Sequence, residues 1–473
     1  MKKIIIPLLF IAVIILACSG NRKQGLTDEP QTEEAKTTTI YESEEVMDSI
    51  IPAPGVKYKG SRAVDVSNPP LKLNLANQSK EDKSLDVADY YSKVKYVKLK
   101  HPLPSEQGGF LGDANMHMYY EQGSSSGRGI NSNVYLAKDK IIAGDRYFGY
   151  HCYDKDGTFE YSIITMNRQP DYNSKTRTIT INWDKSLRMF GSFTVLGDNC
   201  LFTTSENGRS RMFFHNLTKR KNYLERPSFG GELCLLNPTT FVSYSYRVQS
   251  EQQNVILGSL DYKGDILCTF LNYNPLVKDQ KKAATNPDQR FLYYYDDQLT
   301  VRQGYNDTIY RMVSEKELKP VYIMDFGKQK LDGETGLYGD KSDKLIPYVW
   351  TETSDFIFIM YTKNYDCPNT RNNGSVIFNY AYYDKASKKL YNIPSHKLPE
   401  EFVIENSLEG GIPLIGNNMM ANGKRLHIGY TKYQLESIIK QKDFASLPQP
   451  QQDNLKKQYE DLGDQEMLVM ILE

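Results

Sequence analysis

The sequence predicts an all-β protein: a six-bladed β-propeller with short C-terminal helices, closed by pairing of its N-terminal and C-terminal strands. Three observations predict this fold. Short β units with similar turns recur along the chain from about residue 90 onward, and helical periodicity is scarce until the end. An apolar strand also stands at each end of this repetitive region, as closure of a ring requires.

The repeat consists of small antiparallel sheets with tight turns. The clearest unit has three strands within residues 134–159, the last two joined by the turn Asp154-Lys155-Asp156-Gly157. A lone sheet exposes two apolar faces, and stacking such sheets around an axis buries both while leaving only short edges. Six units are expected, over residues 134–159, 213–224, 256–267, 306–323, 378–391 and 411–428.

The two ends of the repetitive region are expected to close the ring. Val94–Leu99 alternates along its two faces and Met467–Leu472 is a continuous apolar run, so the two segments suit one shared blade. Two helices are expected before the last strand, over residues 431–442 with a capping box and over residues 453–462 followed by glycine. A pair of β-sandwich domains is the alternative, although the chain has no linker midway.

The first residues predict export. Two lysines precede an apolar run from Ile4 to Leu16, which is too short to span a membrane and is typical of a secretory signal over residues 1–17.

Ile15-Leu16-Ala17-Cys18 resembles the bacterial lipobox, which implies cleavage before Cys18 and lipid on its sulfur. An ordinary signal peptide with a chance cysteine is the alternative. Ser19 follows where Asp would indicate inner-membrane retention, so we expect the outer membrane, with the periplasmic face slightly favoured over the cell surface.

Residues 18–80 are expected to form a lipidated flexible tether, with the propeller over residues 81–473. The tether is rich in Thr, Glu, Lys, Pro and Ser and poor in large apolar residues. Such a segment cannot bury enough surface to offset the entropy lost on ordering. Asp48-Ser49-Ile50 matches a short bacterial O-glycosylation pattern, which makes Ser49 a candidate glycosylation site.

Composition argues against several classes of function. Lys plus Arg equals Asp plus Glu, at 58 each, so no global field favours nucleic acid as a partner. The histidines form no metal-ligand spacing, so neither a metal nor a cofactor is expected. Besides Cys18, the cysteines are widely spaced with no CxxC pair, and we expect buried free thiols at Cys152, Cys200, Cys234, Cys268 and Cys367.

Two motifs are similar to catalytic or metal sites but lack the required context. Residues 123–127, Gly-Ser-Ser-Ser-Gly, match the G-x-S-x-G nucleophile elbow, yet no helical pattern follows, and a flexible loop is expected. The 154–157 turn lacks the spacing and the closing Glu of a calcium loop. We therefore predict no catalytic residue.

One set of residues is expected to gather on a single face. In a propeller, the loops between the second and third strands of all blades lie on the same face around the axis. Arginine forks and tyrosine rings there would suit carboxylates or sugars, and a solvated charged rim is the alternative. The candidate ligand-binding residues are Arg146, Tyr147, Arg247, Arg302, Tyr305 and Lys363.

Several segments resemble the six-bladed β-propeller lipoproteins of Bacteroides and related Bacteroidetes. They include Asn306-Asp307-Thr308-Ile309-Tyr310-Arg311 and Leu408-Glu409-Gly410-Gly411, as well as the strand ending in Leu99-Lys100, where the family has Leu-Glu. The resemblance covers roughly residues 85–473. It implies the propeller fold and a membrane address, but no reaction.

These expectations favour a membrane-anchored lipoprotein whose propeller is a non-enzymatic binding or scaffold module for a glycan, a peptide or an envelope protein. The alternative is a carbohydrate-active enzyme of the same fold, either a lyase or a glycoside hydrolase. Such an enzyme needs a Tyr/His site or paired carboxylates in the central pocket.

Overall fold

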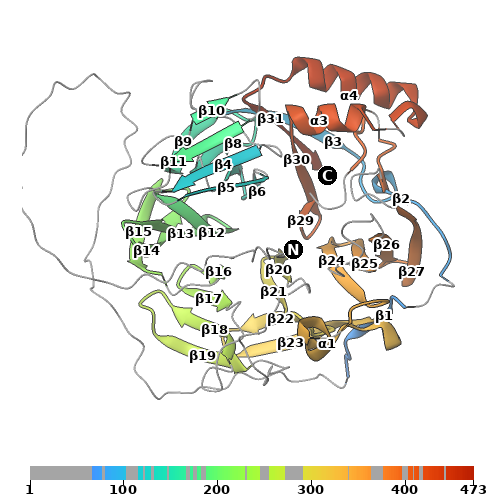
Figure 1. Cartoon of the computed structure of the whole chain (residues 1–473), viewed down its shortest axis with the longest axis horizontal. Helices are drawn as coiled ribbons and strands as arrows, with labels where there is room; N and C mark the ends of the chain where they lie inside the picture. The colour runs from blue at the N-terminus through green and yellow to red at the C-terminus, as the bar shows by residue number, and fades with distance from the viewer. Residues whose placement is uncertain are drawn as a thin grey trace, which may run out of the picture. The chain divides into compact units, whose positions relative to one another are not determined.

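Six antiparallel sheets surround a common axis and form the blades of a β-propeller, with the first strand of each blade nearest the axis (Figure 1). The prediction of a six-bladed all-β fold is therefore confirmed. This computed structural model describes residues 67–76, 80–102, 115–120, 123–128, 133–145, 149–166, 171–173, 178–182, 188–228, 232–244, 255–271, 291–338, 340–363, 376–396, 403–408, 410–414, 419–441 and 444–473.

The blades follow one another along the chain, and each strand pairs with the next. Blade 1 contains β6 (Asn133–Leu136), β7 (Lys140–Asp145), β8 (Gly149–Asp154) and β9 (Phe159–Thr165), and blade 2 contains β12 (Met189–Leu196), β13 (Asn199–Glu206), β14 (Arg209–Asn216) and β15 (Lys221–Pro227). Blade 3 contains β16 (Glu232–Asn237), β17 (Thr240–Tyr244), β18 (Val255–Asp261) and β19 (Ile266–Leu271), and blade 4 contains β20 (Phe291–Tyr295), β21 (Gln298–Arg302), β22 (Thr308–Ser314) and β23 (Glu317–Asp325). Blade 5 contains β24 (Leu345–Glu352), β25 (Phe356–Lys363), β26 (Ile377–Asp384) and β27 (Lys389–His396).

Blade 6 joins the two ends of the described chain. Its strands are β29 (Met420–Asn422), β30 (Arg425–Thr431), β31 (Glu466–Leu472) and β3 (Val94–Lys100), in that order from the axis outward. β3 and β31 are antiparallel, and their register runs from Val94 opposite Leu472 to Lys100 opposite Glu466. The predicted closure of the ring by these two segments is confirmed.

An N-terminal strap, defined as residues 71–76 and 80–100, contacts the outer strands of blades 4 and 5 and then supplies the outer strand of blade 6. β1 (Leu71–Asn74) pairs in parallel with β23 of blade 4, and Asp82 forms a bridge with Asn392 in β27 of blade 5. β2 (Leu85–Asp86) then pairs with β28 (Ile404–Glu405), before β3 enters blade 6. β1 thus lies upstream of residue 81, where the sequence placed the start of the propeller.

The apolar core is divided among the interfaces between neighbouring blades. β25 illustrates the pattern: Phe356 and Phe358 lie in the cluster shared with blade 6, whereas Ile357 and Ile359 lie in the cluster shared with blade 4. Side chains alternate along a strand, so a blade covered on both faces requires a continuous apolar run. Four of the five cysteines expected as buried free thiols lie in these clusters as such: Cys152, Cys200, Cys234 and Cys268. The fifth, Cys367, lies outside the described residues.

Two helices replace the turn between β30 and β31. α3 (Lys432–Ile439) begins after Thr431, which forms the predicted capping box with Gln434, and α4 (Gln449–Asp461) starts four residues before the expected position. Leu435, Ile438 and Leu455 bury this pair against blades 5 and 6. The other short helices among the described residues are η1 (Val87–Asp89), η3 (Gly327–Gln329), α1 (Gly333–Tyr338) and η5 (Phe444–Ser446).

A separate four-stranded sheet was not expected from the sequence. It contains β4 (Asn115–Tyr120), β5 (Gly123–Arg128), β10 (Asp171–Asn173) and β11 (Thr178–Asn182), from two hairpins that flank blade 1 along the chain. The G-x-S-x-G segment lies in β5 and pairs with β4, so the expectation of a loop was wrong. A strand is not the strand-to-helix turn that a nucleophile elbow requires.

Candidate functional site

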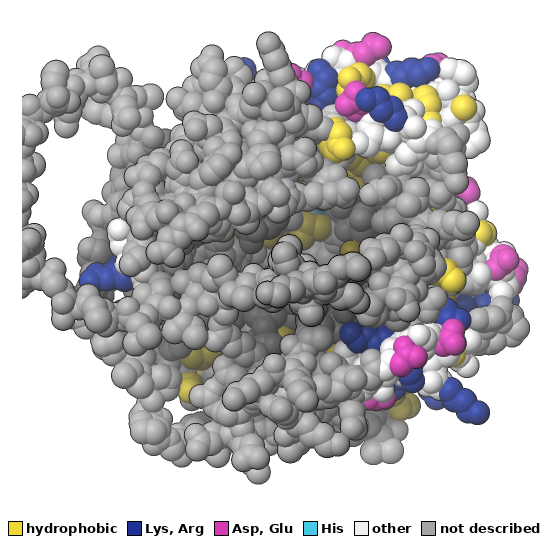
Figure 2. All heavy atoms as spheres, in the orientation of Figure 1, with side chains coloured by type: hydrophobic (Ala, Val, Ile, Leu, Met, Phe, Trp, Pro, Cys, Tyr) yellow, Lys and Arg dark blue, Asp and Glu magenta, His cyan; other side chains and the backbone are white. Residues whose placement is uncertain are grey.

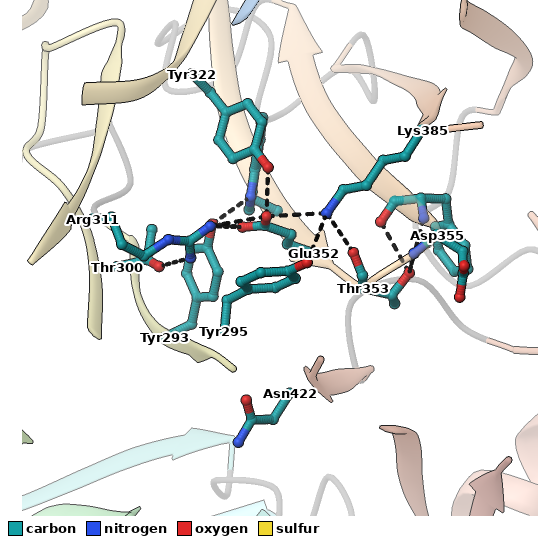
Figure 3. Close-up of polar contacts among 12 residues, drawn as sticks. Tyr293, Tyr295, Thr300, Arg311, Tyr322, Glu352, Thr353, Asp355, Lys385 and Asn422 are labelled. Carbon is teal, nitrogen blue, oxygen red and sulfur yellow. Dashed lines mark hydrogen bonds and ion pairs between the residues drawn. The ribbon is translucent and has the colours of Figure 1, made fainter. Parts of the chain in front are cut away.

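A buried polar cluster centres on Glu352, the last residue of β24 (Figure 3). Its carboxylate, which is fully buried, accepts two hydrogen bonds from Nη2 of Arg311 in blade 4, at 3.0 and 3.1 Å. The hydroxyl groups of Tyr322 and Tyr293 donate to it at 2.5 and 2.7 Å, and Nζ of Lys385 lies 3.2 Å away. The cluster therefore joins blade 4 to blade 5.

The charges of this cluster keep Glu352 ionised. Burial alone would raise the pKa of Glu352, but the positive charges of Arg311 and Lys385 and the tyrosine hydroxyl groups outweigh burial and lower it. The ring of Tyr295 lies between the two cations, with its centre 4.5 Å from each. Because the carboxylate already accepts five hydrogen bonds, the cluster suits a structural clamp better than a reactive group.

The turns between first and second strands are also joined at this end of blades 4, 5 and 6. Asn422 Nδ2 donates to Asp297 Oδ1 at 3.0 Å, and the backbone N–H of Ser354 donates to the carbonyl of Gly423 at 2.9 Å. Gly423 has φ +61°, and a Cβ there would lie 2.2 Å from Asp296 Oδ1. These contacts leave little space between the turns.

A concavity of about 510 Å³ lies between blades 1 and 2, at the end of the strands opposite to the end where the Glu352 cluster is found. It is bordered by the turn between the second and third strands of blade 2, so it opens on the face that the sequence predicted for ligands. Asn207 and Gly208 form that turn with φ values of 52° and 71°, the left-handed backbone of a tight Asn-Gly hairpin. The turn fixes Glu206 directly opposite Arg209.

Alternation along the strands gives this concavity a charged rim over an apolar floor. Phe213 and Ile164, both nearly buried, belong to the apolar cluster between the two blades. The rim consists of three arginines and two glutamates: Arg188, Arg209, Arg211, Glu206 and Glu225. We call this concavity the arginine pocket.

Two ion pairs fix most of the rim. Arg188 Nε donates to Glu206 Oε2 at 2.8 Å, and Arg211 Nη1 donates to Glu225. Both pairs are partly exposed, so each stabilises the fold only slightly, but together they orient four side chains. Arg209 is exposed and forms no ion pair with any described residue.

A second concavity, of about 730 Å³, lies at the end of the strands where the Glu352 cluster is found. Asp89, Asp355 and Glu473 line it together with Lys424 and Arg425, so negative side chains outnumber positive ones there. Charges of both signs also alternate over the surface near α3 and α4 (Figure 2). The arginine pocket, by contrast, has one more positive than negative side chain.

The ligand-binding residues predicted from the sequence differ in the burial of their side chains, where the structure describes them. Arg302 is only 1% exposed, and its guanidinium lies 5.3 Å from the centre of the Phe291 ring. Tyr305 is 4% exposed, whereas Lys363 forms an ion pair with Asp343 at 2.7 Å. Arg302 and Tyr305 thus lie inside the protein, and a ligand-binding role for the set stays a prediction. The other candidates lie outside the described residues: Cys18, Ser49, Arg146, Tyr147 and Arg247.

Sequence reasoning missed the arginine pocket, although one signal was available. Glu206-Asn207-Gly208-Arg209 is a strong hairpin sequence flanked by alternating polar and apolar residues. It could have placed Glu206 and Arg209 side by side. Arg188 and Ile164 come from outside this hairpin, and no local pattern predicts their approach.

The described residues contain neither a metal-binding group nor a membrane-spanning helix. No group of three His, Cys, Asp or Glu side chains in this part of the chain is arranged to hold a metal ion. Within the same residues, no helix is long and apolar enough to cross a membrane.

Comparison with protein families decides where the chain belongs. Residues 53–441 match the model of a family described as a domain of unknown function, DUF4933. The chain belongs to this family. The DUF4933 match includes β1, blades 1 to 5 and three strands of blade 6, and it stops before β31.

Solved structures show which fold the DUF4933 chain shares. A Bacteroides fragilis protein described as exported is 13% identical, with a TM-score of 0.51, over 85% of this chain and 98% of that one. At this identity the likeness extends to the fold alone. TolB from Acinetobacter baumannii, at 8% identity over 72% of this chain and 63% of that one, has a TM-score of 0.29, too low to support an inference. None of the curated proteins matches the DUF4933 chain.

Proposed function

We propose that this protein is a membrane-anchored lipoprotein whose propeller is a non-enzymatic binding module for a glycan, a peptide or an envelope partner. The arginine pocket is the observation that carries the binding role. Four of its five charged side chains are already oriented by ion pairs, and a tight turn fixes the backbone at Arg209, so the ordering entropy lost when a ligand binds is reduced. Its volume also lies within the usual range for small-molecule sites, about 300–1,000 Å³.

The anchor rests on the sequence. Lys2 and Lys3, the apolar run and Ala17-Cys18 together favour export and lipidation of Cys18. The Bacteroides fragilis protein of the same fold is described as exported, which supports export of this chain. Ser19 favours the outer membrane, and the basic residues that follow favour its periplasmic face.

Lipidation is tested by labelling cells with a palmitate analogue. The wild-type protein is expected to take up the label and to sediment with outer membranes, whereas Cys18→Ser is expected to lose both properties. Ser19→Ala serves as the control, because it leaves the cysteine in place. An unlabelled wild-type protein would contradict the anchor, and digestion by protease added to intact cells would contradict the periplasmic address.

The binding role is tested with the mature chain carrying Cys18→Ser, which keeps it in solution. We expect saturable binding to at least one glycan or peptide on defined arrays, without release of reducing ends or of unsaturated sugar products. Catalytic turnover of a bound glycan would contradict the non-enzymatic role and favour a lyase or a glycoside hydrolase. Failure to bind any array ligand or purified envelope component would contradict the binding role itself.

A further inference from the structure

The chemistry of the arginine pocket indicates more than a general binding role. Its five described charged side chains sum to one positive charge, because three are arginines and two are glutamates. Glu206 and Glu225 each pair with one arginine, and Arg209 forms no ion pair with a described residue. An anionic group that enters beside Arg209 therefore gains a partner without breaking an existing ion pair. Arginine presents a planar fork that matches a carboxylate in two parallel hydrogen bonds.

The two glutamates restrict what else the ligand can be. A carboxylate is an acceptor only, so Glu206 and Glu225 can accept hydrogen bonds from donors of the ligand besides those from their arginines, and they repel a multiply charged anion such as phosphate. Hydroxyl groups supply such donors. A ligand with one carboxylate and several hydroxyl groups therefore matches both kinds of side chain on the rim.

The floor of the pocket adds an apolar requirement. Phe213 and Ile164 present the upper end of the apolar cluster between blades 1 and 2, and Phe213 is 7% exposed. The C–H face of a sugar ring packs well against such a surface, because burying it removes apolar area from water. A fully solvated ion would gain nothing from this floor.

We propose that the arginine pocket binds a uronic acid unit of an acidic saccharide, with the carboxylate of the sugar on Arg209. Hydroxyl groups of the same unit donate to Glu206 and Glu225, and the ring lies over Phe213. This inference rests on the proposed binding role and names its ligand class. Arg188 and Arg211 are positioning residues for the two glutamates.

Calorimetry with the mature Cys18→Ser chain tests the ligand class. The probes are four-unit oligosaccharides of galacturonate, glucuronate and mannuronate, each compared with the same oligosaccharide after reduction of its carboxyl groups. We expect at least one acidic form to bind and its reduced form to bind at least tenfold more weakly. Affinity for the acidic form is also expected to fall as salt is raised, because Arg209 is exposed.

Variants test the pocket itself. Arg209→Ala is expected to weaken binding of the acidic probe at least tenfold, and Arg209→Lys to restore part of it, because the charge returns without the fork. Lys219→Ala is the matched control: it removes an exposed cation from the other end of the same blade and should leave affinity unchanged. Circular dichroism spectra and melting temperatures confirm that each variant folds.

The outcomes separate this inference from the proposed function. Equal binding of acidic and reduced probes, or full affinity in Arg209→Ala, would overturn the uronate assignment. Binding of other glycans or peptides with no binding of any acidic saccharide would overturn it too, while the binding role would stand. A chain that binds no ligand of any class would remove both.

Discussion

Arg311 in blade 4 donates two hydrogen bonds, of 3.0 and 3.1 Å, to the carboxylate of Glu352 in blade 5. Forty-one residues separate the two in sequence, and both side chains are almost completely buried. A buried carboxylate is stable only with counter-charges and donors around it. The interface between these blades should therefore depend strongly on this pair.

Replacement of Glu352 by Gln should destabilise the propeller. The change leaves the guanidinium of Arg311 buried without its counter-charge, which typically costs about 3–5 kcal/mol. Unfolding in guanidinium chloride, followed by circular dichroism, measures the loss. Glu460→Gln on the exposed side of α4 is the control and should change stability by less than about 0.5 kcal/mol. Equal stability of both variants would show that the cluster does not hold the blades together.

The contribution of Glu352 to the free energy of unfolding should also depend on pH. Its folded-state pKa is lowered below its ordinary value of 4.5, so the carboxylate contributes stability above that pH and loses it as pH falls through the folded-state value. The difference in unfolding free energy between wild type and Glu352→Gln is therefore expected to be full at pH 7 and to shrink in acid. A constant difference from pH 7 to pH 3 would contradict the lowered pKa.

His215 predicts a second pH dependence at milder acidity. Burial lowers its pKa from 6.5 to about 4, although a hydrogen bond with Asn222 opposes this. The unfolded chain thus binds a proton before the folded one, so stability falls as pH drops from 6.5 towards 4. Between pH 7 and pH 5 His215 alone should account for about 2 kcal/mol. In His215→Gln this part of the loss should disappear in urea unfolding measured at the two pH values, and an unchanged pH profile would refute the assignment.

The N-terminal strap should be part of the folded unit. Leu73 and Leu75 are 2% and 1% exposed and pack in the cluster between blades 4 and 5. Leu73→Ala should cost about 2–5 kcal/mol, whereas Lys72→Ala in the same strand removes only an exposed ion pair worth about 0–1 kcal/mol. Chains starting at residue 67 should also melt at a higher temperature than chains starting at residue 81. Equal melting temperatures would mean that β1 contributes nothing.

The turn at Gly423 should tolerate substitution less well than an open turn. Gly423 and Gly197 both have positive φ, of 61° and 56°, so alanine at either position pays a backbone cost of about 1–2 kcal/mol. Only at Gly423 would the new Cβ also meet a neighbour, Asp296 Oδ1 at 2.2 Å. Gly423→Ala should therefore lower the free energy of unfolding more than Gly197→Ala does. Equal losses would show that Asp296 moves aside freely.

Local patterns were sufficient to predict the blades and their closure. The alternation of Val94–Leu99 fits an edge strand covered on one face, and the apolar run at Met467–Leu472 fits a strand covered on both faces. Neighbouring positions at the outer side of one shared blade satisfy both. The capping box at Thr431 likewise needs no long-range information. β1 was missed because four residues, Leu71–Asn74, carry too little alternation to distinguish a strand from a tether.

The sequence predicted the arginine pocket and the Glu352 cluster less completely than it predicted the fold. The sequence indicated the face on which the arginine pocket opens, because the topology of a propeller fixes that face. It could not indicate that Arg302 points into the interior or that Arg311 meets Glu352, because such contacts depend on the angle between neighbouring blades. No pattern along one strand reports that angle.

The pairing of β3 with β31 also sets the order of events when the protein is made. β3 leaves the ribosome early, but its partner is among the last segments to be synthesised, so the ring stays open until almost the whole chain has been delivered. During that time β3 and the unfinished sixth blade present unpaired edges that can aggregate. A chain truncated before residue 466 should therefore be insoluble, even though it contains all the strands of five blades.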